Sequence, residues 1–320
     1  MQTLKKIVLG LSMCAAVGAA SAQVDKPVRL LVGFAPGGSA DIAARLLADG
    51  MKDDLKQSVV VENRPGAGGR IAAEAIRNGP PDGSLLMLTP IVVTVLAPLV
   101  FTKLPYDPLV DFAPVAHVAN FQFAMSVAAT HPAKNVQELV DWWKANKPMA
   151  NFGTPAPGSL PHFFGVMIER GAGVDLVHVP YNGGGPLMNA VMGSQVSSGI
   201  DTLVDQIELH RTGKIRLIAT SGAQRSPLVP DVPTFAEGGL KGVEGTSWFA
   251  VYAPAKTPDA TVRQLNASIN KALAVPELRE RLMKLGLEPT GGTPADLSAR
   301  MAQDTARWSP VVKASGFKAD

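Results

Sequence analysis

The chain has 320 residues, with 30 lysines and arginines against 27 aspartates and glutamates, and 46% of its residues are hydrophobic. This near balance of charge disfavours proteins that bind nucleic acid or attach to a charged membrane surface. The single cysteine, Cys14, lies close to the N-terminus, so the rest of the chain can form neither a disulfide nor a cysteine metal site.

Residues 1–22 have the pattern of a secretory signal peptide. Lys5 and Lys6 precede an apolar run that is too short to span a bilayer, and Ala20-Ser21-Ala22 is a small-residue cleavage site. We therefore expect cleavage near Ala22 and a secreted protein. The remaining chain would carry a net charge of only about +1 and no thiol. No later segment has 18 uninterrupted apolar residues, so no membrane-spanning helix is predicted.

The first third of the chain alternates strands and helices. Residues 28–34 form an apolar, β-favouring run, and Ser39 is predicted to cap a helix that has Asp41 in its first turn. A strand over 58–63 precedes the glycine-rich turn 66–69 and a helix over 70–78, and a further strand covers 84–90. This order is typical of an α/β fold with a mostly parallel sheet.

The remainder of the chain repeats this order. We predict extended segments over 122–130, 150–154, 175–181, 195–201 and 214–221, and helices over 136–145, after Ser159, and over 186–192. From Pro258 onward the pattern is mostly helical. Segments near 121–127 and 247–253 are predicted to cross between two lobes, which gives lobe 1 residues 23–122 and 251–320 and lobe 2 residues 123–250.

One short turn occurs in both lobes. Ala35-Pro-Gly-Gly-Ser39 precedes one predicted helix and Ala156-Pro-Gly-Ser159 precedes another. The first N–H groups of a helix have no partner inside it and favour an anion, and glycine lets a ligand approach the backbone closely. We expect these turns, with the one at 66–69, to meet at one cleft. The alternative is that each is an ordinary turn followed by an ordinary cap.

Motifs of several enzyme classes are missing. The sequence has no GxGxxG, no GxxxxGK[ST], no GxSxG and no HExxH, and its five histidines form no close pair along the chain, so neither a cofactor nor a metal is predicted. Ser159 and His162 could be a nucleophile and its base, but hydrogen bonding to backbone or ligand is the more favoured role. Tyr181 and Asn182 precede three glycines, and Asp201 ends an extended segment; both suit either a ligand site or a plain turn.

Several long segments resemble the Bug family of tripartite tricarboxylate transporter substrate-binding proteins. They include PVRLLVGFAPGGSADIAARLLA at 27–48, VVVENRPGAGGRIAAEAI at 59–76, GVDLVHVPYNGGGPLMNAV at 173–191 and GKIRLIATSGAQRSPLVPDVPTFAEGG at 213–239. The resemblance implies a two-lobed periplasmic binding protein fold of type II, with two crossover strands as the hinge. It implies capture of a small organic acid, held by backbone N–H groups, hydroxyls and ordered waters, and not an enzyme.

The resemblance also implies the positions of the ligand contacts. By position they are Phe34, Ala35, Gly37, Gly38, Ser39, Ala67, Gly68, Thr89, Pro90, Ser159, His162, Tyr181, Asn182 and Asp201. Asn182 stands where the family usually has lysine, and the apolar stretch 90–101 replaces a Gly-Thr turn, which favours a ligand with an apolar or aromatic body. The implied partners are the permease subunits of a tripartite carrier or a sensor protein, and we expect a monomer. A periplasmic hydrolase using Ser159 and His162, and a ligand-sensing partner module, remain as alternatives.

Overall fold

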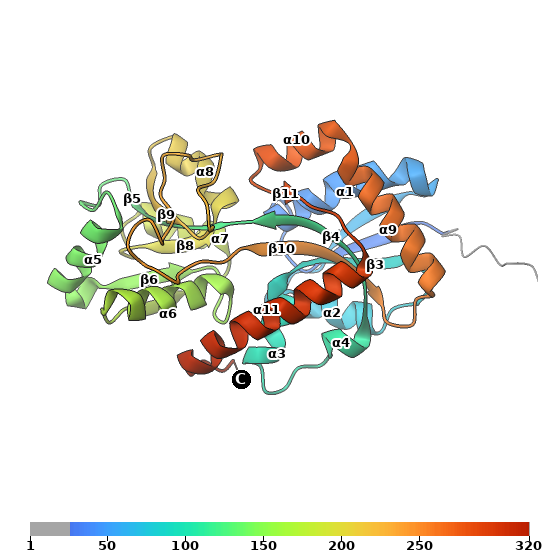
Figure 1. Cartoon of the computed structure of the whole chain (residues 1–320), viewed down its shortest axis with the longest axis horizontal. Coiled ribbons are helices and arrows are strands. Elements are labelled where there is room, and N and C mark those ends of the chain that lie inside the picture. Colours follow the sequence, from blue (N-terminus) through green and yellow to red (C-terminus); the bar gives the residue numbers. More distant parts are fainter. Residues whose placement is uncertain (1–25, 320) are drawn as a thin grey trace, which may run out of the picture.

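A computed structural model describes residues 26–319 of the chain, which form two lobes, each built on its own β-sheet (Figure 1). The predicted signal peptide lies outside the described residues. None of the described helices is long and apolar enough to cross a membrane.

Lobe 1 contains a six-stranded sheet in the order β11-β4-β10-β3-β1-β2. Its strands are β1 (Val28–Val32), β2 (Val59–Asn63), β3 (Leu85–Pro90), β4 (Phe112–Phe121), β10 (Ser247–Pro254) and β11 (Glu288–Pro289). Helices α1 (Ser39–Leu55), α9 (Asp259–Ala274) and α10 (Pro276–Lys284) pack against one another beside the sheet. The other helices are η1 (Ala67–Gly69), α2 (Arg70–Arg77), η2 (Val92–Leu96), α3 (Ala97–Val100), α4 (Pro108–Asp111) and α11 (Pro294–Ser315).

Lobe 2 contains a five-stranded sheet in the order β7-β6-β8-β5-β9. Its strands are β5 (Phe123–Ala128), β6 (Asn151–Thr154), β7 (Val177–Pro180), β8 (Gly199–Thr202) and β9 (Ile215–Thr220). Its helices are α5 (Val136–Ala145), η3 (Lys147–Met149), α6 (Leu160–Ala172), α7 (Gly184–Met192) and α8 (Leu203–Arg211). Side chains of α5 and α6 join the larger apolar core, whereas those of α7 and α8 form a separate one on the sheet's other face.

The chain crosses between the lobes twice, and one serine ties the two crossings together. Only Gln122 separates β4 from β5, and residues 221–246 lead from β9 back to β10. The Ser221 hydroxyl accepts from the Phe123 N–H at 3.0 Å and donates to the Gly245 carbonyl at 2.6 Å. Because β10 pairs with lobe 1 strands along its whole length, the predicted boundary at 250/251 falls inside a strand. We propose that lobe 2 comprises residues 123–246.

The C-terminal helix spans both lobes. Helix α11 packs on β4 of lobe 1, and the Trp248 indole N–H donates to its Asp304 at 2.7 Å. Its far end reaches α6 of lobe 2, where Arg170 donates to the Ala314 carbonyl (Figure 1). Sequence analysis placed residues 251–320 entirely in lobe 1, and the far end of α11 differs from that expectation because it lies against lobe 2.

Candidate functional site

In each sheet the strands that run parallel to one another have their carboxyl ends at the junction between the lobes. The chain leaves lobe 1 at the carboxyl end of β4, and β1, β2 and β3 run in the same direction as β4, because β10 is antiparallel to both β3 and β4. It enters lobe 2 at the amino end of β5, and β8 and β9 are antiparallel to β5, while β6 and β7 run with β8. The loops after β1, β2, β3, β6, β7, β8 and β9 therefore lie at the edges that face the junction, which is where open α/β sheets bind ligands.

The predicted site residues lie on these loops. Phe34 to Ser39 follow β1, Ala67 and Gly68 follow β2, and Thr89 and Pro90 end β3. In lobe 2, Ser159 and His162 follow β6, Tyr181 and Asn182 follow β7, and Asp201 lies in β8. The structure thus brings all of them to the edges that face the junction. Their contact with a ligand stays a prediction.

The repeated turn has the same hydrogen-bond pattern in both lobes. Gly37 and Gly158 have left-handed φ angles of 82° and 69°, which glycine adopts without strain. Each donates its N–H to the side chain four residues later, Gly37 to Asp41 at 2.9 Å and Gly158 to the Nδ1 atom of His162 at 3.1 Å. An Ala-Pro-Gly turn is thereby fastened to the first turn of the helix it precedes.

This bonding changes which N–H groups can face a ligand. The N–H groups of Gly37 and Gly158 are used within their turns, contrary to expectation. The N–H groups of Ser39 and Ala40 at the start of α1, and of Ser159 at the N-cap of α6, have no partner inside their helices. The main-chain donors of the site are therefore displaced by one to three residues from Gly37 and Gly158.

Neither predicted serine cap forms. Gly38 is the N-cap residue of α1, and Ser39 is the first helical residue. Ser159 does occupy the N-cap position of α6, but its hydroxyl donates to the Ala156 carbonyl at 2.6 Å instead of accepting from the helix. In α1 the acceptor role belongs to Asp41, whose carboxylate also pairs with Arg45 at 2.9 Å. Burial opposes ionisation of Asp41, yet the hydrogen bonds from Arg45 and Gly37 hold its pKa below the ordinary value.

The two glycine turns of lobe 1 touch through their backbones. A Cβ atom added to Gly33 would lie 2.6 Å from the Cα atom of Gly69, and one added to Gly69 would lie 3.2 Å from the Phe34 ring. Residues 66–69 all have positive φ, including Ala67 at 48°, a non-glycine residue in a strained conformation. The absence of side chains at 33 and 69 is what lets the loops after β1 and β2 meet.

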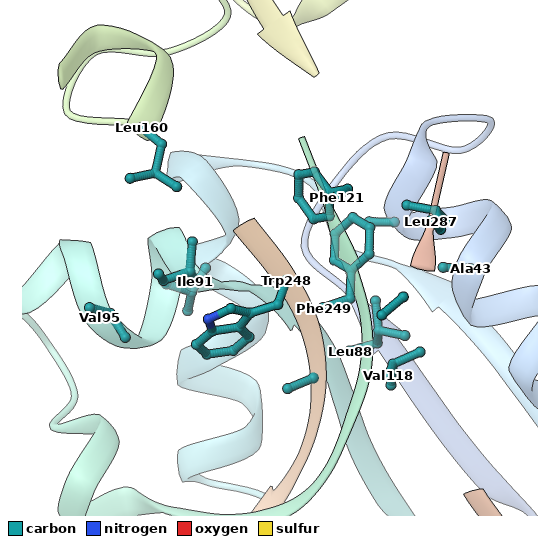
Figure 2. Close-up of a cluster of buried hydrophobic side chains, with 14 of the residues drawn as sticks. Ala43, Leu88, Ile91, Val95, Val118, Phe121, Leu160, Trp248, Phe249 and Leu287 are labelled. Carbon is teal, nitrogen blue, oxygen red and sulfur yellow. The ribbon is translucent and has the colours of Figure 1, made fainter. Parts of the chain in front are cut away.

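An apolar seam closes part of the junction. Leu160, at the start of α6, points toward Ile91 beside η2, and Val95 lies on the same helix (Figure 2). All three side chains are at most 2% exposed. Most of the stretch that was predicted to line the ligand with an apolar wall is thus buried, with Ile91 facing lobe 2 and Val93 packed near Gly69 of lobe 1, so it does not support a preference for an apolar-bodied ligand. Thr89, near the end of β3, is also buried, and its hydroxyl oxygen has no hydrogen-bond partner.

In lobe 2 the loops after β6 and β7 are joined. The N–H of Tyr181 donates to the Thr154 carbonyl at 2.8 Å, and that of Gly183 donates to the Pro155 carbonyl at 2.9 Å. The Tyr181 ring lies 3.1 Å from where a Cβ atom of Gly153 would be, so it is half-buried over that strand. Asn182 is exposed.

Two histidines that are distant in sequence stack in the structure. The rings of His162 and His178 are 4.0 Å apart and nearly parallel, and Phe317 from the C-terminal segment meets the edge of His162 at 4.7 Å. These histidines form no close pair along the chain, but the fold brings their rings together. Burial lowers the pKa of both imidazoles to about 4, and the neighbouring His178 adds to the lowering at His162. Residues 26–319 contain no group of three or more potential metal ligands.

The hydrogen bonds of Ser159 and His162 argue against a serine nucleophile. The Nδ1 atom of His162 accepts from the Gly158 N–H, and the Ser159 hydroxyl donates to a carbonyl, so the two side chains are engaged separately. A general base must lie within hydrogen-bond reach of the proton it removes. Ser159 and His162 thus serve the turn, which agrees with the role that sequence analysis favoured.

Because His162 and His178 are held neutral in the folded protein, we expect its stability to fall in acid. Above pH 6.5 the folded and unfolded chains both carry them uncharged, whereas between pH 6.5 and 4 only the unfolded chain binds protons there, so stability falls as pH falls. We expect His162→Asn to reduce the loss between pH 7 and 5 by about 1 to 2 kcal/mol. Urea unfolding of both proteins at the two pH values measures this; equal losses would contradict it.

The comparisons with known proteins settle the family. Residues 43–317 match the profile of the family described as tripartite tricarboxylate transporter family receptor. This chain belongs to that receptor family. The protein BugT of Bordetella pertussis is 32% identical over 316 residues, covering 97% of each chain.

Two solved structures show the same fold. Rpa4515 of R. palustris, solved with adipate, is 33% identical, with a TM-score of 0.87 over 92% of this chain and 98% of that one. MatC of Rhodopseudomonas palustris, solved with bound malate, is 32% identical, with a TM-score of 0.82 over 90% of this chain and 99% of that one. The predicted two-lobed α/β fold and the resemblance to the Bug members of this receptor family are confirmed.

Sequence reasoning missed four residues of this region. His178 pairs with His162, Phe317 closes over it, Asp41 fastens the first turn, and Asp205 lies beside Asp201. Asp41 carried a signal, since it stands at the same spacing from Gly37 as His162 does from Gly158. Asp205 likewise stands only four residues after Asp201, whereas His178 and Phe317 come from distant elements that no local pattern connects.

Proposed function

We propose that this protein is a periplasmic solute-binding protein that captures a small organic acid, of the dicarboxylate class, between its two lobes. The observation that carries this proposal is the convergence of seven strand-end loops at the junction, with an Ala-Pro-Gly turn and a helix start from each lobe. The adipate and malate in the two related structures support the ligand class.

The main-chain donors of the helix starts grip the ligand without an arginine. A micromolar complex needs about 8 kcal/mol. Three or four hydrogen bonds to a charged group contribute about 1.5–3 kcal/mol each, and burial of the ligand's carbon chain adds about 25 cal/mol per Å², while association offsets part of this sum. Binding without turnover is the expected behaviour, since Ser159 and His162 are not arranged for catalysis. The loaded protein, a monomer, then meets a membrane permease or a sensor through a surface that both lobes form.

A thermal-shift panel tests the proposal. Malate, adipate and other small mono-, di- and tricarboxylates are added at up to millimolar concentration to the purified protein. A ligand at 100 times its Kd adds about 2.7 kcal/mol, which raises Tm by about 5 °C or more in a chain of this size. Stabilisation by one class of acid, with no product formed, supports the proposal. No shift with any acid, including in protein freed of co-purified ligand by unfolding and refolding, would overturn it.

A further inference from the structure

Asp201 has a carboxylate oxygen that nothing in the structure satisfies. The residue is 1% exposed, and its Oδ1 atom accepts from the Thr202 N–H at 2.8 Å. Its Oδ2 atom is buried and has no hydrogen-bond partner. A buried carboxylate oxygen without a donor is costly, and such groups in native proteins usually have a function or hold a proton.

A second carboxyl group lies beside it. Asp205 is in the first turn of α8 and is exposed. A Cβ atom on Gly184, the first residue of α7, would lie 2.5 Å from Oδ2 of Asp201 and 3.3 Å from Oδ2 of Asp205. The two carboxyl groups thus converge on the bare backbone where the loop after β7 enters its helix, and any side chain at 184 would separate them.

The surrounding elements supply no compensating positive charge. Strands β5, β6 and β8 and helix α7 carry no lysine, arginine or histidine. On α6 the nearest titratable group is the neutral His162, and on α8 His210 and Arg211 lie in the last turn, with Arg211 paired to Glu208. Arg216 of β9 is bonded to carbonyls of residues 129–133. Burial, and then the neighbouring Asp205, raise the pKa of Asp201 well above its ordinary value.

We propose that Asp201 and Asp205 form a carboxyl pair that holds one proton at neutral pH, and that capture of an anionic ligand at this edge is coupled to proton uptake by the pair. The ligand part of this inference rests on the proposed function; the shared proton does not. Asp201, as the neutral acid, donates a hydrogen bond where an ionised carboxylate would repel the guest. The proton comes from solvent and no covalent bond changes.

The shared proton is tested without any ligand. Aspartate side-chain carboxyl carbons are labelled with ¹³C and titrated by NMR in the wild type, Asp201→Asn, Asp205→Asn and the control Asp53→Asn, which replaces an exposed carboxylate on α1. We expect one resonance to titrate well above pH 4, to vanish in Asp201→Asn and to move to lower pH in Asp205→Asn only. If every aspartate of the wild type titrates near its ordinary pKa, or if Asp205→Asn does not lower the raised pKa, the inference fails.

Proton uptake is tested by calorimetry. Malate and adipate are titrated at pH 7.5 in two buffers with different ionisation enthalpies. We expect the wild type to take up a fraction of a proton, and affinity to fall by up to about tenfold per pH unit above the pair's own pKa. Asp201→Asn, an uncharged isostere, should bind with no uptake. Binding with the same heat in both buffers overturns the coupling. No binding of any acid from the thermal panel overturns the proposed function instead, and the NMR titration still decides the shared proton.

Discussion

Gly33→Ala should weaken ligand binding at least about tenfold and lower the free energy of unfolding by about 1–3 kcal/mol. The added Cβ atom would lie 2.6 Å from the Cα and 3.0 Å from the carbonyl oxygen of Gly69. Because both atoms belong to the backbone, no side-chain rotation relieves the clash. The loops after β1 and β2 must separate, which moves the start of α1 away from its position in the site. Calorimetric titration and urea unfolding measure the two effects.

The control for this variant is Gly38→Ser. Gly38 has φ −77°, which any residue adopts, and its added Cβ atom would meet only the Ala35 carbonyl oxygen at 3.5 Å. Serine also suits the N-cap position that Gly38 occupies. Its stability should stay within about 0.5 kcal/mol of the wild type. An equal stability for Gly33→Ala and the wild type would show that the loops do not meet through their backbones.

Gly165→Ala should destabilise lobe 2 although it replaces glycine in the middle of a helix. Helix propensity alone predicts a gain of about 1 kcal/mol. The new Cβ atom, however, would lie 2.0 Å from one carbon of the Phe152 ring and 2.3 Å from the next. Phe152 is 1% exposed and its ring stacks on His178, so it cannot turn aside. We expect a net loss of about 1–3 kcal/mol in urea unfolding, because overpacking outweighs propensity.

The same helix provides the matched control. Gly171, near the end of α6, is exposed, and its nearest contact for an added Cβ atom is Leu240 at an ordinary 3.6 Å. Gly171→Ala should therefore stabilise the protein by about 0.5–1 kcal/mol. Two glycine-to-alanine changes six residues apart would then have opposite signs. Matching gains in both variants would contradict the packing of α6 against β6.

Local sequence patterns were sufficient for most of the elements. The apolar runs predicted the strands to within a few residues, and the helix over 136–145 coincides with α5. Glycine-rich turns located the strand ends, since few other residues allow the positive φ found at Gly37 and Gly158. The β-favouring runs near 121–127 and 247–253 correspond to β5 and β10, the strands that adjoin the two crossings.

What local patterns could not give was the partner of each polar group. Serine is a frequent cap, but here Asp41 and His162, four residues beyond the glycines, take the N–H groups instead. The stretch from Ile91 to Val95 was taken as a wall for the ligand, yet most of it is buried, and Leu160 of the other lobe points toward Ile91 (Figure 2). Both outcomes depend on how the lobes and the helix starts are placed in three dimensions. The stacking of His162 on His178 depends on the same placement.

The most direct test of a site built from main-chain groups is the affinity of Gly38→Thr for the acid that stabilises the protein most. Threonine keeps a favourable N-cap, and an extended φ accommodates its branched side chain, so the empty protein should melt within about 2 °C of the wild type. Its methyl and hydroxyl groups would project from the backbone where the ligand must approach the start of α1. Calorimetry should show affinity reduced at least about tenfold. Unchanged affinity in a normally folded Gly38→Thr protein would contradict this account of the site.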